Sequence, residues 1–74
     1  MKVFVEVNSY FNRFGAASGE VELPHGSSVA DLLLTLGIPQ QEVGFVIRKG
    51  TVLRMDDLLF DGDSLGLLPF AVGG

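Results

Sequence analysis

The chain has 74 residues, of which nine are acidic and five are basic, and it contains no cysteine. Its net charge of −4 opposes binding to nucleic acid or anionic lipid, so we expect a protein partner with a basic docking surface. Without cysteine, the sequence offers no disulfide, thiol nucleophile or cysteine-ligated metal site.

Size and hydropathy favour one small domain. Apolar residues make up 47% of the chain, enough for one modest core at this length. No apolar run approaches the roughly 18 residues that a membrane helix needs. Glu6 introduces a carboxylate too early for a secretory signal. We therefore expect a cytoplasmic protein that binds no membrane.

The first predicted element is a strand over residues 2–7, in which apolar and polar side chains alternate with the period of a half-buried strand. A polar connection follows over residues 8–19. We expect its aromatic side chains to hold a short helical turn against the core; they are Tyr10, Phe11 and Phe14. A second strand is predicted over residues 20–23, since Pro24 cannot donate to a strand ladder.

A helix of about three turns is predicted after residue 27. Ser28 and Asp31 match the capping-box pattern that opens helices. Apolar side chains then recur at the helical spacing, at Val29, Leu32, Leu33 and Leu36. Gly37 supplies the stop.

The second half of the chain reads as three strands. Short β-prone runs at residues 45–48 and 51–53 flank Lys49-Gly50, where Gly50 can adopt the positive φ of a tight turn. The turn cluster Asp61-Gly62-Asp63 leads into a last strand over residues 64–69, which Pro69 should end. This order predicts an α+β fold of the β-grasp (ubiquitin-like) type, a mixed sheet of four to five strands with one main helix packed on one face.

We divide the chain into a domain over residues 1–69 and a flexible tail over residues 70–74. The tail ends in Gly73-Gly74, and glycine permits passage through a narrow channel and unhindered attack at the terminal carbonyl. A terminal carboxylate has a pKa of about 3.3 to 3.7, so it is ionised and needs activation, for example by adenylation from ATP. An inert terminus is the alternative, because glycine is common in chain ends.

Over nearly its whole length the sequence resembles the MoaD/ThiS family of sulfur carriers, which includes the small subunit of molybdopterin synthase and the thiamine-pathway carrier. The segments that carry the resemblance are Lys2-Val3-Phe4-Val5, Val29-Ala30-Asp31-Leu32-Leu33, Leu36-Gly37, Asp61-Gly62-Asp63-Ser64-Leu65, Leu68-Pro69 and Gly73-Gly74. The resemblance implies that an E1-like adenylyltransferase consumes ATP to adenylate Gly74, which then becomes a thiocarboxylate. It implies no cofactor bound by the chain itself.

The implied partners, besides the activating enzyme, are a sulfur donor protein and either the molybdopterin synthase large subunit or thiazole synthase. Phe70 stands where the molybdopterin branch often has a second proline, and Lys49-Gly50 stands where the family commonly has Asn-Gly. The molybdopterin and thiamine pathways therefore both stay open. Two other functions also stay open: a ubiquitin-like modifier conjugated through Gly74, and a β-grasp binding module with an inert tail.

A docking surface is predicted beside the tail. If Leu65 and Leu67 face the helix, then Gly66, Leu68 and Phe70 face away, and Phe4, Phe45 and Ile47 share that outer side. The predicted partner-binding residues are Leu68, Pro69, Phe70, Ala71, Val72, Phe4 and Ile47. The alternative is that these side chains complete a small core.

We predict structural roles, and no metal site, for the other charged residues. Four carboxylates do not follow the calcium-loop spacing and are assigned to turns: Asp56, Asp57, Asp61 and Asp63. His25 lacks a second histidine for a metal site, and four bases are assigned to solubilising charge: Arg13, Arg48, Lys49 and Arg54. No catalytic motif stands out, so we expect a carrier and not an enzyme.

Overall fold

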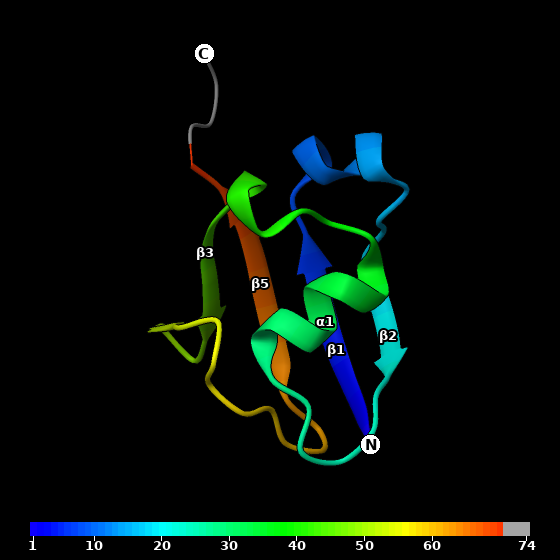
Figure 1. Ribbon diagram of the computed structural model, residues 1–74, viewed down its shortest axis with the longest axis vertical. Helices are drawn as coiled ribbons and strands as arrows, with labels where there is room; N and C mark the ends of the chain where they lie inside the picture. Colours follow the sequence, from blue (N-terminus) through cyan, green and yellow to red (C-terminus); the bar gives the residue numbers. More distant parts are fainter. Residues whose placement is uncertain (71–74) are drawn as a thin grey trace.

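The protein, for which we have a computed structural model, is described over residues 1–70 as a mixed five-stranded sheet with one α-helix (Figure 1). The elements are β1 (Lys2–Val7), the 3-10 helix η1 (Ser9–Phe14), β2 (Gly19–Glu22), α1 (Val29–Leu36), the 3-10 helix η2 (Gln40–Glu42), β3 (Val43–Arg48), β4 (Thr51–Leu53) and β5 (Ser64–Pro69). In this part of the chain, no helix is long and apolar enough to cross a membrane.

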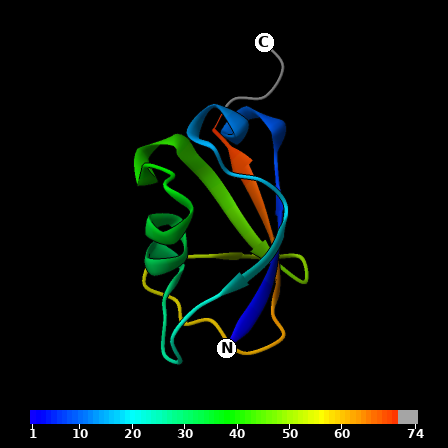
Figure 2. The same ribbon diagram turned by 90° about the vertical axis from the view of Figure 1, so that its right-hand side faces the viewer.

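The strand order is β2-β1-β5-β3-β4, with β1 and β5 parallel at the centre and the other neighbours antiparallel. In two perpendicular views, α1 lies over one face of this sheet (Figures 1 and 2). The predicted α+β, β-grasp architecture is therefore confirmed.

The core forms between α1 and one face of the sheet. Alternation along β1 turns three valines inward, and α1 buries Val29, Leu32 and Leu33 against them and against the inward side chains of β5. Leu65 and Leu67 of β5 are 2% and 0% exposed. Their burial confirms that they face the helix.

Local hydrogen bonds explain where α1 begins and ends. The backbone N–H of Asp31 donates to Ser28 Oγ at 3.3 Å, and the N–H of Ser28 donates to Asp31 Oδ2 at 2.9 Å. Gly37 ends the helix in the left-handed conformation, with φ of 76°. The capping box and stop are confirmed, but α1 has eight residues, about two turns and not three.

The predicted strands hold with small shifts. β1, β4 and β5 have the predicted bounds, β2 lies one residue earlier, and β3 begins two residues earlier, at Val43, after the short helix η2 that the sequence did not indicate. The hairpin turn between β3 and β4 has φ of 50° at Lys49 and 78° at Gly50. Positive φ at both positions is the geometry for which asparagine and glycine are preferred, so Lys49 is the less favoured residue there.

The connection after β1 folds as expected. Asn8 caps η1 by accepting a hydrogen bond from the N–H of Tyr10 at 2.9 Å. Phe11 is fully buried, and Tyr10 and Phe14 pack against the core from its edge. This places η1 at the end of the sheet where β5 also ends (Figure 1).

Candidate functional site

The segment after β5 is the first part of the predicted site. Phe70 is the last described residue and is 68% exposed. Pro69 is buried, because alternation places it on the helix side, opposite Val43. Its prediction as a docking side chain is thus corrected: Pro69 packs within the domain. The other predicted tail residues lie outside the described residues, so their roles stay predictions; they are Ala71, Val72, Gly73 and Gly74.

The start of β3 closely approaches the point where the chain leaves β5. The register between β3 and β5 shifts between Val43 and Phe45, a bulge that includes Gly44. A Cβ on Gly44 would lie 2.7 Å from the carbonyl oxygen of Pro69 and 2.8 Å from the nitrogen and Cα of Phe70. These are backbone atoms and cannot rotate away. The missing side chain of Gly44 therefore lets the Pro69-Phe70 backbone lie directly on β3.

A polar pair, Tyr10 and Glu42, lies beside Pro69 and Phe70. The Tyr10 hydroxyl donates to Glu42 Oε1 at 2.6 Å and so joins η1 to η2. That hydrogen bond raises the pKa of Tyr10 above 10.0; burial and the charge of Glu42 act in the same direction, and Arg13 opposes them. The guanidinium carbon of Arg13 lies 3.8 Å from the centre of the Tyr10 ring. At neutral pH Tyr10 is thus a protonated donor that holds two short helices together.

The sheet face away from α1 carries a cluster of apolar side chains, and we call this side the open face. Its apolar members are Phe4 of β1, Phe45 and Ile47 of β3, Val52 of β4 and Leu68 of β5. Register places Phe45 beside Leu68 and Ile47 beside Val52. Phe4, Phe45 and Val52 are 49%, 47% and 55% exposed. Clustered large apolar side chains with this exposure are typical of a protein-contact surface.

The open face includes three predicted docking residues, Phe4, Ile47 and Leu68. Phe45 shares the face, as the outer-side pattern predicts. Val52 was missed, although the alternation in Thr51-Val52-Leu53 was the signal that could have found it. The alternative, in which these residues complete the core, does not hold for Phe4 and Phe45, because about half of each side chain is exposed.

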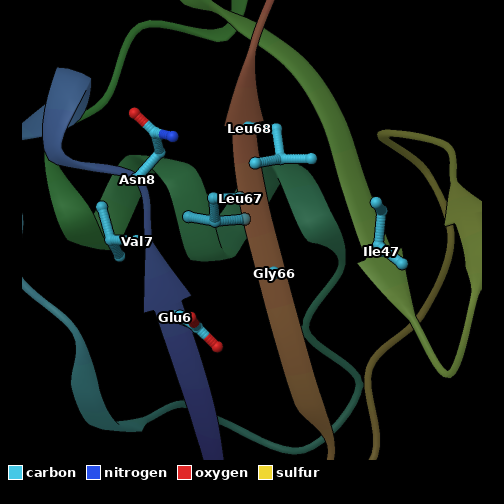
Figure 3. A pocket seen from close by; sticks show the side chains of 7 residues that line it. All are labelled: Glu6, Val7, Asn8, Ile47, Gly66, Leu67 and Leu68. Atoms are coloured by element: carbon cyan, nitrogen blue, oxygen red, sulfur yellow. The ribbon is translucent and has the colours of Figure 1, made fainter. Parts of the chain in front are cut away.

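A hollow of about 330 Å³ opens in the open face over β5 (Figure 3). Its floor is Gly66, where an added Cβ would meet no atom within 4 Å. In the sheet register Gly66 lies between Glu6 of β1 and Ile47 of β3. Figure 3 shows these two side chains on either side of Gly66, with Leu68 two residues further along β5. The absent side chain of Gly66 thus leaves an indentation with an acidic and an apolar wall.

The clustered carboxylates act in turns, as the sequence predicts. Three of them accept a hydrogen bond from a backbone N–H: Asp57 at 2.7 Å, Asp61 at 2.8 Å and Asp63 at 2.8 Å. Asp56 pairs with Arg54 at the surface. Among residues 1–70, no group of three or more histidine, aspartate or glutamate side chains is placed to hold a metal ion.

Arg48 has a structural role, so its assignment to solubilising charge is wrong. Arg48 Nη1 lies 2.9 Å from Asp63 Oδ2, and the two side chains are 26% and 15% exposed. The same nitrogen donates to the carbonyl oxygen of Leu58 at 3.2 Å. Arg48 therefore ties the loop before β5 to β3, and partial burial makes this pair more than a surface contact.

Comparison with protein-family models decides the family. The model described as the ThiS family matches residues 2–74. The chain belongs to the ThiS family. Membership confirms the resemblance drawn from the sequence, and the matched range includes every strand and Gly73-Gly74. A search of curated proteins found no match to the chain.

Solved structures share the fold of this ThiS-family chain over nearly its whole length. A Pyrococcus furiosus protein described as molybdopterin converting factor, subunit 1, is 26% identical, with a TM-score of 0.74 over 93% of this chain and 97% of that one. SAMP1 from Haloferax volcanii is 18% identical, with a TM-score of 0.70 over 100% of both chains. A ubiquitin-like protein from Caldiarchaeum subterraneum is 20% identical, with a TM-score of 0.57 over 99% of this chain and 100% of that one. The last two show the shared fold alone.

Proposed function

We propose that this ThiS-family chain is a sulfur carrier whose C-terminal Gly74 carboxylate is adenylated and then converted to a thiocarboxylate. The observation that carries the proposal is the family match over residues 2–74, which includes Gly73-Gly74. The likeness to the Pyrococcus furiosus protein, whose description names molybdopterin conversion, supports it. The sulfur would serve molybdopterin or thiamine biosynthesis.

The proposed chemistry takes place at the Gly74 carbonyl carbon. The ionised carboxylate attacks the α-phosphorus of ATP and releases pyrophosphate, which gives a mixed anhydride with a good leaving group. Sulfide supplied by a donor protein then attacks the carbonyl carbon and displaces AMP, which leaves the thiocarboxylate. Small carriers of this family are generally non-catalytic, so the E1-like adenylyltransferase supplies the catalytic groups and consumes the ATP. The carrier contributes an accessible terminus and binds no cofactor.

We propose that the open face is where partners dock. Full burial of one phenylalanine side chain contributes about 1.5 to 3 kcal/mol, so covering the exposed parts of Phe4 and Phe45 would dominate a small interface. The partners are the E1-like adenylyltransferase, then a sulfur donor and either the molybdopterin synthase large subunit or thiazole synthase. With net charge −4, the carrier favours basic surfaces on them. The proposed location is the cytoplasm.

Intact mass of the protein isolated from its native source without added thiol tests the proposal. We expect a fraction whose mass corresponds to one oxygen replaced by sulfur, and fragmentation should place the change on Gly74. Alkylation separates a thiocarboxylate from oxidised Met1 or Met55, because only the sulfur anion reacts. The same spectrum identifies the last residue of the native chain.

Other masses would indicate the other functions. A lysine-linked Gly74 on other proteins would indicate a ubiquitin-like modifier, which uses the same adenylate with an amine as the nucleophile. A terminus that stays unmodified after incubation with ATP and the cognate E1-like enzyme would contradict the proposal and favour a binding module.

Deletion of Gly74 gives a matched functional test. We expect loss of ATP-dependent modification, because the reacting carboxylate moves by one residue. Thermal stability should stay within about 0.5 kcal/mol, since the buried core of the described chain ends at Pro69. A large stability loss together with normal modification would contradict the assignment of Gly74.

A further inference from the structure

The indentation at Gly66 is unusual for the middle of a strand. Glycine inside a strand loses packing and costs conformational entropy, and it often marks a place where a ligand or another backbone approaches closely. The backbone does not require glycine at position 66. Its φ lies outside the left-handed region, and an added Cβ would meet no atom within 4 Å. A valine or threonine would therefore fit β5 better in the isolated domain. The glycine keeps a space open on the outside of the sheet.

The walls of this space differ in chemistry. Ile47 and Leu68 provide apolar surface on one side, and Glu6 provides a carboxylate on the other (Figure 3). Asn8 adds a second polar group to the same rim. A purely apolar occupant would leave Glu6 without a counter-charge and cost desolvation free energy.

Glu6 is available to an outside cation. Within residues 1–70 it takes part in none of the ion pairs, which join Lys2 to Glu20, Arg48 to Asp63 and Arg54 to Asp56. Arg48 is held by Asp63 and by the Leu58 carbonyl, and Lys2 lies with Glu20 at the edge strand. The carboxylate beside the indentation is thus unpaired within the described chain.

We propose that the Gly66 indentation receives one arginine or lysine side chain from the enzyme that activates Gly74. The methylene stem packs on Ile47 and Leu68, and the cation meets the Glu6 carboxylate. Long basic side chains combine these two properties, and arginine is enriched at interface centres. This inference rests on the proposed function, because it assigns a contact to the activating enzyme.

The test measures ATP–pyrophosphate exchange by the cognate E1-like enzyme with wild-type carrier and with Gly66→Val, Glu6→Gln and Asp56→Asn. Gly66→Val fills the indentation, and we expect KM to rise about tenfold or more with kcat within about twofold. Its melting temperature should equal or exceed that of the wild type, because valine suits a strand. If Gly66→Val fails to fold, Gly66→Ala should raise KM by a smaller factor.

Glu6→Gln tests the charge. We expect KM to rise about twofold to fivefold at low ionic strength, with the difference shrinking at high salt, because salt screens a partly exposed ion pair. Asp56→Asn is the control for loss of one charge. Asp56 lies in an exposed loop whose neighbours Met55 and Asp57 bond to the start of α1, on the other side of the sheet, so its loss should change KM by less than about twofold.

The outcomes separate the two proposals. A higher KM for Gly66→Val with an unchanged KM for Glu6→Gln would contradict the proposal that the occupant is basic. Wild-type KM for both variants would overturn the whole inference and leave the carrier function standing. Failure of wild-type carrier to support exchange would overturn the proposed function, and this inference with it.

Discussion

On the helix side of the sheet, Leu65 and Leu67 are 2% and 0% exposed, whereas on the open face Phe4 and Phe45 are 49% and 47% exposed. Single strands carry both kinds of position: Phe4 lies between the buried Val3 and Val5 on β1, and Phe45 precedes the buried Val46 on β3, because side chains alternate between the two faces of a strand. The residue types are equally apolar. The two faces differ in what packs on them: α1 buries one face, and no element within residues 1–70 packs on the open face. Substitutions can therefore separate the stability of the fold from the proposed partner contact.

The largest expected effect is on the helix side. Leu65→Ala should lower the free energy of unfolding by about 2 to 5 kcal/mol, because it leaves a cavity between β5 and α1. Phe45→Ala is the matched control on the open face and should cost only about 1 kcal/mol, since half of the ring is already in water. Urea unfolding measures both, and equal losses would show that the two faces are not energetically distinct.

A smaller effect is expected where the chain leaves β5. Gly44→Ala should destabilise the domain by about 1 to 3 kcal/mol, because the new methyl group meets the backbone of Pro69 and Phe70. Activation at Gly74 should also slow, since the start of the tail is displaced. Gly66→Ala is the stability control, because its Cβ meets no atom within 4 Å. Thermal melts that do not distinguish the two variants would contradict the close packing at Gly44.

The smallest effect concerns the edge of the core and depends on pH. The pKa of Tyr10 in the folded chain lies above 10.0, so its hydrogen bond stabilises the fold fully below pH 10.0 and is lost as the pH rises through the folded-state pKa. Tyr10→Phe should be less stable than the wild type at neutral pH, and the gap should narrow in alkali. Tyr10 is the single tyrosine, so phenolate absorbance reports it alone. A phenolate midpoint below pH 10.0 would contradict the Glu42 contact.

Local patterns predicted the elements well where one short segment contains all the information. The alternation of β1, the capping box at Ser28 and Asp31, and the stop at Gly37 each depend on neighbours within a few residues. The ends of α1 were predicted correctly and only its number of turns was overestimated, because the eight residues between Ser28 and Gly37 make about two turns. The short helix η2 was missed for a related reason: its three residues have no period of their own.

The candidate site also contains residues that a single strand predicts and residues that only contacts between strands explain. Phe4, Ile47 and Leu68 could be predicted on one face from the period of single strands. Pro69 was misplaced, although the alternation that turns Leu65 and Leu67 inward also turns Pro69 inward; its register with the buried Val43 shows the same face. Gly44 and Gly66 look alike in the sequence. One lies against the backbone of Pro69 and Phe70, and the other opens toward solvent between Glu6 and Ile47.

The sequence by itself determined the fold class, the family resemblance and the proposed role of Gly74, because these depend on element order and on residues adjacent in the chain. Tertiary structure decided the rest. The partners of Arg48 and Glu42, the neighbours of Gly44 and the walls around Gly66 come from segments far apart in sequence that the sheet register brings together. Register across a sheet is a property of several strands packed at once, so no single segment of the sequence contains it.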